Sequence, residues 1–321
     1  MKLQIIFLPT SRLIAKSDSQ LTALLRLLAK GNHDIHAEPA SAVLCQVMGV
    51  TRQTDCPVAS ISWLGEGEDP GTYYWLYADP VHLMLQRDYF TLEEPLPLAL
   101  SRQDANSILT TLNQHFAQDG MKFYLGNTGR WYLRLEAPAE IITTTPEAAL
   151  GLDVGPFLPK GSDASKWNQL LNEMQMLLHT HAINQVRESM GELPANSLWL
   201  WGGGALPGHS KTSAKAVFSD HALAKGLARL AQVRYFAVPD NMEAMLLQDD
   251  PDVLLVLDDA HEAEQKWFSP LLAALKARQI EQITVHFAVR DQVLSVTVKP
   301  ADLWKFWRRP QALQNYFMAN T

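Results

Sequence analysis

Hydrophobic positions follow two alternating patterns over the first 50 and the last 160 residues. Short apolar runs predict strands, and segments with an apolar residue every third or fourth position predict amphipathic helices. The predicted strands are 3–8, 197–201, 214–219, 233–238, 252–258, 281–289 and 293–298. The predicted helices are 19–31, 39–50, 165–191, 220–231, 240–248 and 260–278. Apolar strands that alternate with helices predict an α/β fold, a mostly parallel sheet with helices on both faces.

The stretch between these halves has a different pattern. Runs 57–64, 72–78 and 81–92 read as strands of one sheet, and 121–135 reads as a hairpin around Gly126-Asn127-Thr128-Gly129. Ser101 is a candidate N-cap of a helix that ends at Gly120. We therefore expect a core domain made of 1–60 and 151–321, with a smaller α+β insertion domain at 61–150. The Pro- and Thr-rich segment 143–163 reads as a long connection.

Charge and composition narrow the function classes. The net charge is −7, from 27 basic and 34 acidic residues, which argues against a nucleic-acid partner. The apolar run after Met1 stops at Pro9, so no signal peptide is expected, and no run approaches a membrane span. Cys45 and Cys56 are expected to stay reduced. These features predict a soluble, cytoplasmic protein without a membrane partner.

Gly202, Gly203 and Gly204 follow the predicted strand 197–201. They fit either a phosphate-binding loop or a place where two backbones pass closely. The phosphate-loop pattern G-x-x-x-x-G-K-[ST] nearly fits 203–208, but His209 occupies the lysine position and Pro207 removes a backbone N–H. The spacing therefore favours a tight turn or a close backbone approach.

Two family resemblances rest on this region. The segment "LPANSLWLWGGGALP", the hairpin "GRWYLRL" before the Pro/Thr-rich connection, and the long helix near 165–190 together resemble archaeal-type cofactor-independent phosphoglycerate mutases. The phrases "YWLYADPVHLMLQRD" (74–88) and "LWLWGGGALP" (198–207) resemble bacterial regulatory proteins of the RpfE type. The mutase resemblance implies an alkaline-phosphatase-like fold, two divalent metals held by Asp and His residues, and a serine that carries the phosphoryl group.

The sequence departs from that mutase pattern at its metal ligands. Pro9-Thr10-Ser11 stands where the family has an Asp-Gly pair, and Trp201 stands where it has arginine. Asp258, Asp259 and His261 follow a predicted strand as metal ligands would, with Glu262 beside them. The same acidic residues suit the N-terminus of the next helix, and this interpretation is favoured because a metal site needs three or four ligands.

A polar cluster on the insertion domain is a candidate ligand site. Asp79 either begins a turn before Pro80 or joins His82, Arg87 and Asp88 in binding a ligand. The mutase resemblance places Arg130 near the substrate. We therefore predict that a small anionic or phosphorylated ligand contacts Gly202, Gly203, Gly204, Arg130, Asp79, His82 and Arg87.

Two functions follow as hypotheses. The first is a non-catalytic, phosphoglycerate-mutase-like protein that acts by binding in a regulatory role, without a cofactor. The alternative is a metal-dependent phosphohydrolase or mutase with a rearranged Mn or Zn site at Asp258, Asp259 and His261. In the tail "WKFWRRP" (304–310), Trp304, Phe306 and Trp307 are expected to pack on the sheet while Lys305, Arg308 and Arg309 stay solvated.

Overall fold

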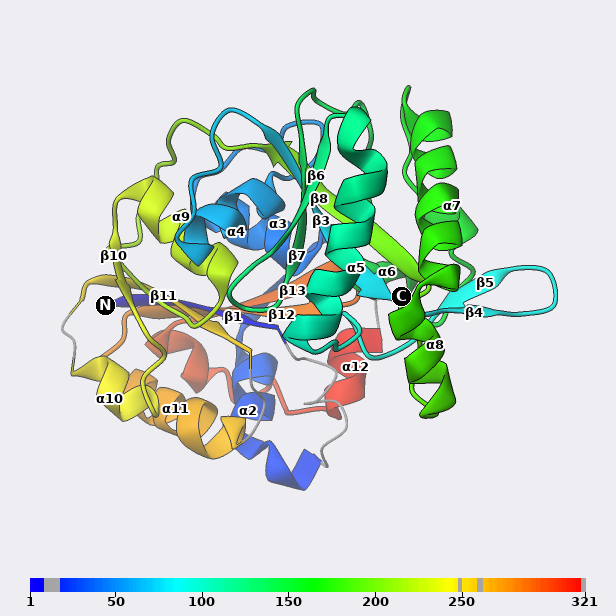
Figure 1. Ribbon diagram of the computed structural model, residues 1–321. Coiled ribbons are helices and arrows are strands. Elements are labelled where there is room, and N and C mark those ends of the chain that lie inside the picture. The colour runs from blue at the N-terminus through cyan, green and yellow to red at the C-terminus, as the bar shows by residue number, and fades with distance from the viewer. Residues whose placement is uncertain (9–17, 248–249, 259–261, 319–321) are drawn as a thin grey trace. The chain divides into compact units, whose positions relative to one another are not determined.

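The computed structural model describes residues 1–8, 18–247, 250–258 and 262–318, which fall into two compact units (Figure 1). Unit 1 consists of Met1–Val50 and His209–Thr321, and unit 2 of Thr51–Gly208. The predicted insertion, 61–150, is shorter than unit 2, which also includes 151–208. The extra segment packs there because its strand Ser197–Ala205 pairs with strand Tyr74–Val81, and its long helix packs on Ser197–Ala205.

Unit 1 contains the predicted α/β sheet. Its seven strands lie in the order β10-β9-β11-β1-β12-β13-β2. Their bounds are β1 Lys2–Phe7, β2 Asn32–His36, β9 Ala216–Phe218, β10 Arg234–Phe236, β11 Asp252–Leu257, β12 Gln282–Val289 and β13 Gln292–Val298. The strands from β10 to β12 run parallel to one another. Strand β13 pairs antiparallel with β12, and β2 pairs antiparallel with β13. The predicted α/β class is therefore confirmed. The polar edge strand β2 was not predicted, because it buries almost no apolar surface.

Helices cover both faces of this sheet (Figure 1). They are α2 Thr22–Lys30, α3 Ala40–Val47, α9 Ala222–Ala231, α10 Met242–Leu246, α11 Ser269–Lys276 and α12 Leu313–Met318. Alternate residues of β1, namely Leu3, Ile5 and Phe7, point into one core with α2 and α11. The intervening residue Ile6 is equally buried, and the alternation along a strand points it to the opposite face of the sheet. Both faces of the central strands are therefore apolar, as a parallel sheet requires.

Unit 2 is built on a separate antiparallel sheet in the order β6-β7-β3-β8. Its strands are β3 Tyr74–Val81, β6 Met121–Leu125, β7 Trp131–Leu135 and β8 Ser197–Ala205, and a second hairpin pairs β4 Leu83–Leu85 with β5 Phe90–Leu92. The hairpin predicted around Gly126–Gly129 is confirmed as β6–β7. Two expectations are wrong: β8 does not join the parallel sheet, and 81–92 does not continue the sheet of β3 but forms its own.

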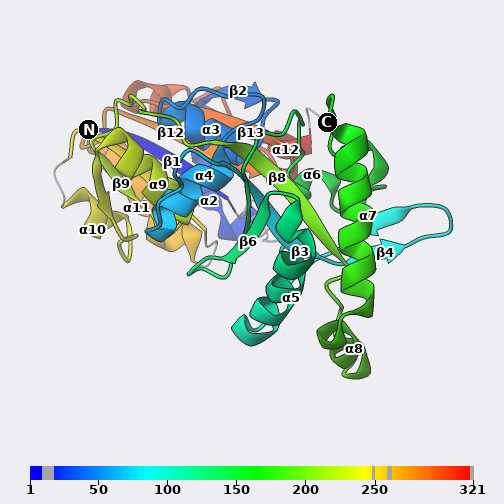
Figure 2. The ribbon, with the colours of Figure 1, turned by 45° about the horizontal axis from the view of Figure 1, so that its top comes forward.

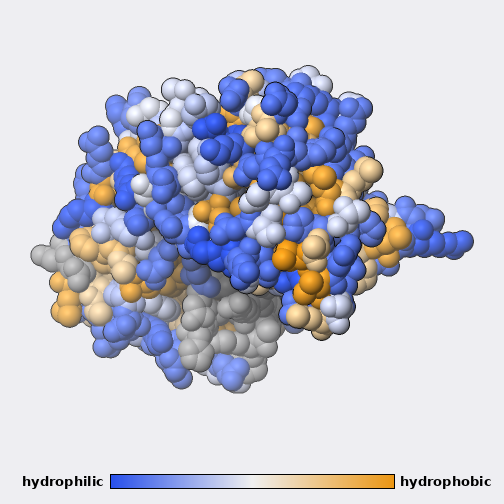
Figure 3. Space-filling model, viewed as in Figure 1, coloured by the Kyte–Doolittle hydropathy of each residue, from blue (hydrophilic) through white to orange (hydrophobic). Residues whose placement is uncertain are grey.

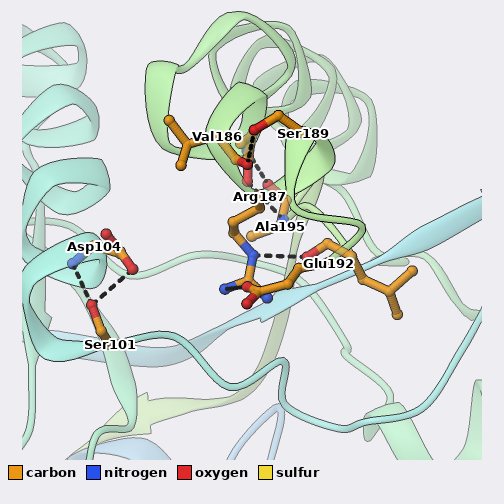
Figure 4. Close-up of polar contacts among 9 residues, drawn as sticks. Ser101, Asp104, Val186, Arg187, Ser189, Glu192 and Ala195 are labelled. Atoms are coloured by element: carbon orange, nitrogen blue, oxygen red, sulfur yellow. Dashed lines mark hydrogen bonds and ion pairs between the residues drawn. The ribbon is translucent and has the colours of Figure 1, made fainter.

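The helices of unit 2 are α4 Val58–Glu66, α5 Arg102–His115, α6 Pro146–Ala149, α7 Ala164–Thr180 and α8 Ala182–Ser189. Segment 57–64 was expected to be a strand but forms α4. The predicted helix 165–191 is interrupted at His181, which has extended backbone and whose Nδ1 accepts the Ile183 N–H at the start of α8. Ser101 caps α5 as predicted, by accepting the Asp104 N–H (Figure 4).

The two faces of the unit 2 sheet differ in chemistry. Tyr74, Leu76 and Ala78 point to an apolar core with α5 and α7, which lie next to each other in Figures 1 and 2. Trp75, Tyr77 and Asp79 alternate with them and face the side on which α4 packs. The second face is therefore aromatic and carries a buried carboxylate.

The chain leaves and re-enters unit 1 at one place. Gly49 has φ +75°, and a Cβ added to it would lie 1.8 Å from the carbonyl oxygen of Lys211. The Thr212 hydroxyl donates to the Val47 carbonyl. Glycine is thus required at position 49, where the outgoing and returning chains touch.

The tail 304–310 differs from its prediction. Trp304, Phe306 and Trp307 are 79%, 83% and 65% exposed, so they do not pack on the sheet. Lys305 and Arg308 are the partly buried residues instead, because their side chains find partners: Lys305 pairs with Asp302, and Arg308 donates to backbone carbonyls. In the part of the chain that the structure describes, no helix has the length and apolar character needed to cross a membrane.

Candidate functional site

A buried ion pair lies on the aromatic face of the unit 2 sheet. Asp79 in β3 is 1% exposed, and its Oδ1 lies 2.9 Å from Nε of Arg130, the residue before β7. The Trp201 indole of β8 donates to Asp79 Oδ2 at 2.6 Å. Three strands therefore position the pair, because β3 lies between β7 and β8.

Aromatic rings surround the Arg130 guanidinium. Its carbon lies 4.4 Å from the Tyr77 ring centre and 5.3 Å from the Trp201 ring centre, within the range of cation–π attraction. The Tyr77 hydroxyl donates to Ser62 of α4, and the Tyr132 hydroxyl donates to Glu66 at the end of α4. These contacts fix the rings, so the arginine is held in one orientation.

Burial dominates the electrostatics of this cluster. It raises the pKa of Asp79, although Arg130 and the Trp201 N–H favour the carboxylate. Burial is also the largest single influence on Arg130 and opposes its charge, but Asp79 together with Tyr77, Glu147 and Tyr132 outweighs it, so the pKa of the guanidinium is raised. Arg130 stays charged at neutral pH, because arginine does not lose its proton in proteins. Burial raises the pKa of Tyr77 to about 12, so this phenol stays protonated.

The Arg130–Asp79 contact leaves hydrogen-bonding capacity unused. The contact is an ion pair rather than an aligned hydrogen bond, and among the described residues neither Arg130 Nε nor Asp79 Oδ1 has a hydrogen-bond partner. The Arg130 side chain is 25% exposed, whereas Asp79 is enclosed. A further anion would have to reach the guanidinium from the exposed part of the Arg130 side chain, because Asp79 is enclosed.

The three glycines form a β-bulge inside β8 rather than a loop. Trp75 pairs with Gly204 and Tyr77 with Trp201, so Gly202 and Gly203 both oppose Leu76. Gly202 has φ +68°, which favours glycine. All three are buried, and the Gly202 N–H donates to Thr143 Oγ1, so the expectation of accessible backbone N–H groups is wrong.

Close packing explains why side chains are absent there. A Cβ on Gly203 would lie 2.5 Å from the Tyr74 hydroxyl, and one on Gly204 would lie 2.6 Å from Cβ of Pro57, directly before α4. Of the two interpretations of the sequence, the close backbone approach is the one observed. The absence of side chains at Gly202 and Gly204 thus allows α4 to pack on the sheet.

The long Pro- and Thr-rich connection is tied to this bulge. Asp55 is 7% exposed and accepts hydrogen bonds from both the N–H and the hydroxyl of Thr143, whose Oγ1 accepts the Gly202 N–H. Burial raises the pKa of Asp55, whereas the hydrogen bonds from Thr143 oppose that change. Asp55 therefore acts as an internal acceptor that fixes Thr143 against β8.

The remaining predicted ligand residues do not join the Asp79–Arg130 pair. His82 Nδ1 bonds the Pro194 carbonyl at 2.9 Å, and Arg87 and Asp88 are exposed between β4 and β5. Figure 3 shows this hairpin with a hydrophilic tip and hydrophobic residues near its base. Tyr77 and Trp201 were missed as site residues. The alternation within 74–79 could have indicated Tyr77, because it places this residue on the same strand face as Asp79.

The connection before β8 is fixed by a different arginine. Arg187 of α8 donates through Nε to the Leu193 carbonyl at 2.8 Å and pairs through Nη1 with Glu192 at 3.1 Å (Figure 4). The side-chain amide of Asn184 bonds the backbone of Ala195 in both directions. These contacts set where β8 begins and hence where Trp201 meets Asp79.

Asp258 is a predicted metal ligand at the carboxyl edge of the unit 1 sheet. Asp258 follows β11, whereas Pro9, Thr10, Ser11, Asp259 and His261 lie outside the described residues. Burial raises the pKa of Asp258, His221 lowers it, and Asp220 raises it. His221 Nδ1 accepts the Leu223 N–H. Among the described residues no group of three or more His, Cys, Asp or Glu could hold a metal ion, so these donors do not complete such a site.

Comparison with known proteins finds one kind of relative by sequence. The 2,3-bisphosphoglycerate-independent phosphoglycerate mutase of Methanosarcina mazei is 27% identical over 168 residues, which are 47% of this chain and 42% of that protein. The Methanosarcina acetivorans enzyme is 26% identical over 195 residues, 60% of this chain and 46% of that protein. The Methanothrix thermoacetophila enzyme is 34% identical over 125 residues, 37% of this chain and 32% of that protein.

The match thus spans less than half the length of these curated relatives. No family model matches the chain. Two solved structures align with 93% of it: a cofactor-independent phosphoglycerate mutase from Thermoplasma acidophilum, covered over 89% (18% identity, TM-score 0.42), and a protein from Pyrococcus horikoshii, covered over 87% (15% identity, TM-score 0.47). By sequence the chain is thus similar, at low identity, to part of these 2,3-bisphosphoglycerate-independent phosphoglycerate mutases.

Proposed function

We propose that this phosphoglycerate-mutase-like chain is a non-catalytic binding protein, which recognises a small phosphorylated or carboxylate anion through Arg130. The observation that carries the proposal is the Arg130–Asp79 pair: an arginine whose side chain is partly exposed and whose guanidinium is held in place by an enclosed carboxylate and two aromatic rings. A pre-oriented guanidinium loses little conformational freedom on binding, and its planar fork matches phosphate and carboxylate oxygens.

A carboxylate near Arg130 should also lower its affinity for an anion. Glu147 of α6 is exposed and close enough to raise the pKa of both Arg130 and Asp79. A negative charge there opposes the arrival of an anion. Replacing Glu147 by Gln should therefore tighten binding, which distinguishes anion recognition from a purely structural ion pair.

We also propose that this binding serves a regulatory role. The two phrases that resemble RpfE-type regulators, 74–88 and 198–207, contain β3 and most of β8. These strands contribute Tyr77, Asp79 and Trp201 to the cluster. The resemblance thus involves the strands that hold the proposed anion contact, and it supports binding rather than turnover.

Calorimetric titration with inorganic phosphate and with 3-phosphoglycerate tests the binding. We expect heat of binding with the unmodified chain, at least a tenfold weaker affinity for Arg130→Ala, and a tighter one for Glu147→Gln. Arg134→Ala is the matched control, because Arg134 lies on the same hairpin over the Tyr73 ring and should leave binding unchanged. Equal responses of Arg130→Ala and the unmodified chain would contradict the proposal.

The alternative is a metal-dependent phosphohydrolase or mutase, for which the proximity of Asp220, His221 and Asp258 is the favouring observation. We propose that the purified chain retains no stoichiometric divalent metal, since these donors do not complete a site. Elemental analysis after growth with Mn or Zn tests this. One or two ions per chain, lost in Asp258→Ala and accompanied by mutase or phosphatase activity, would favour the enzyme.

A further inference from the structure

A pocket lies within unit 1. It has a volume of about 540 Å³ and is bounded by the end of α2, the start of edge strand β2 and the segment that leads into α12. Its lining residues are Ala29, Gly31, Asn32, His33, Trp307, Arg308, Arg309, Gln311 and Tyr316. None of them is acidic, although the whole chain carries a net charge of −7.

The cations around this pocket are satisfied by neutral groups. Lys30 is 9% exposed, and its ammonium donates to the backbone carbonyls of Lys305 and Arg308 at 2.6 and 2.7 Å. Arg308 Nη1 donates in turn to the Gly31 carbonyl at 2.7 Å. In the described part of the chain neither Lys30 nor Arg308 forms an ion pair with a carboxylate. Carbonyls supply hydrogen bonds but no negative charge, and Asp302, which interacts with Arg308, is itself paired with Lys305, so the site keeps a positive field.

Arg309 adds an exposed positive charge to the same pocket. The acidic residue nearest in sequence, Asp302, is paired with Lys305 at 2.6 Å. A phosphate group entering the pocket would therefore meet Arg308 and Arg309 without competition from a lining carboxylate. The chemistry favours a ligand that carries at least one phosphate.

Aromatic rings line the same space. Trp307 is 65% exposed, and the rings of Tyr316 and His33 meet edge to face with their centres 5.7 Å apart. Both are fixed: the Tyr316 hydroxyl accepts the Gln311 N–H, and His33 Nε2 bonds the Leu28 carbonyl at 2.7 Å. Exposed aromatic faces beside cations suit a planar ring joined to a phosphate.

We propose that this pocket binds a nucleoside phosphate, with the phosphate at Arg308 and Arg309 and the base against Trp307. The volume falls in the range of small-molecule sites. The Lys30 hydrogen bonds hold the 305–308 turn in place, so the pocket is formed before a ligand arrives. This binding is independent of the anion contact proposed at Arg130.

Calorimetry of the full chain with AMP, adenosine and inorganic phosphate tests the assignment. We expect AMP to bind at least tenfold more tightly than either fragment, because only AMP engages both rings and cations. Trp307→Ala and Arg309→Ala should each weaken AMP binding about five- to tenfold. Both side chains are exposed, so the variants should fold.

Matched controls lie close by. Trp304→Ala removes an equally exposed indole that does not line the pocket, and Arg26→Ala removes an exposed arginine from α2. Both should bind AMP like the unmodified chain, as should Arg130→Ala, which separates this site from the one in unit 2. The proposal is overturned if AMP binds no better than phosphate or adenosine, or if Trp304→Ala weakens binding as much as Trp307→Ala.

Discussion

Asp79 combines two roles that are in tension, since it is an enclosed charge and also the group that orients Arg130. Removing one partner of a buried pair leaves the other charge uncompensated, which costs more than the pair itself contributes. The Trp201 N–H would also lose its acceptor. The stability of unit 2 should therefore be sensitive to this residue.

We expect Asp79→Ala to lower the free energy of unfolding by about 3 kcal/mol, as measured by urea denaturation. The double replacement of Asp79 by Leu and Arg130 by Met should cost less than Asp79→Ala alone, since it leaves no unpaired charge. A double variant less stable than the single one would show that the ion pair is itself a major source of stability.

The sequence was informative about Asp79 and Arg130 but not about what joins them. Both were singled out, one from a short polar cluster and one from a family resemblance. Trp201, by contrast, appeared only as a departure from a family's arginine, yet its indole completes the pair. His82 and Arg87 are close to Asp79 in sequence but point elsewhere, because β3 ends at Val81 and a new hairpin begins. Sequence proximity could not reveal that change of direction.

At the scale of elements, the glycine bulge decides how α4 and β8 meet. Gly204→Ala would place a methyl group 2.6 Å from Cβ and 2.9 Å from Cα of Pro57, where backbone must move. We expect a loss of about 1–3 kcal/mol in urea denaturation. Gly208→Ala is the control, since a Cβ there meets nothing within 4 Å and should change stability by less than about 0.5 kcal/mol.

Strand β12 carries a titratable group inside unit 1. His286 is 6% exposed and bonds Ser295 of β13 through Nδ1, and burial together with nearby His36 lowers its pKa to about 4. The unfolded chain binds a proton near pH 6.5, whereas the folded chain does not until about pH 4. The contribution of His286 to the free energy of unfolding should thus be constant above pH 6.5. It should decrease as the pH falls from 6.5 to 4, by up to about 1.4 kcal/mol per pH unit.

Urea denaturation at a series of pH values measures this slope, and His286→Gln should flatten it. If the variant and the unmodified chain lose stability equally from pH 6.5 to 4, other groups are responsible.

The elements also show why some patterns were misread. Segment 57–64 alternates small and apolar residues as a strand would, but Ser62 and Trp63 contact the β3 face and the run folds as α4. The parallel strands were predicted correctly, because runs such as 252–257 bury every residue but the first. Edge strand β2 has no such run and was invisible in the sequence.

At the scale of the whole molecule, unit 2 is one continuous segment with its own core. We expect residues 51–208 expressed alone to fold, with a single cooperative urea transition and the near-UV circular dichroism of packed Trp63, Trp75 and Trp201. A chain that binds hydrophobic dyes and lacks near-UV signal would show that unit 2 requires unit 1. The change of pattern in the sequence predicted an insertion at 61–150, whereas unit 2 spans 51–208, because β8 has the apolar run of a parallel-sheet strand but pairs with β3.

The contact between Gly49 and Lys211 gives unit 1 a property that its sheet alone would not. Because the two chain crossings touch, unit 1 closes on itself whatever length of polypeptide lies between them. We therefore expect that unit 2 can be replaced by another domain. A short Gly/Ser bridge from Val50 to His209 should restore a continuous host domain, and any domain with adjacent termini should fit in the same place. Recombination at this junction should therefore exchange unit 2 without disturbing the α/β sheet.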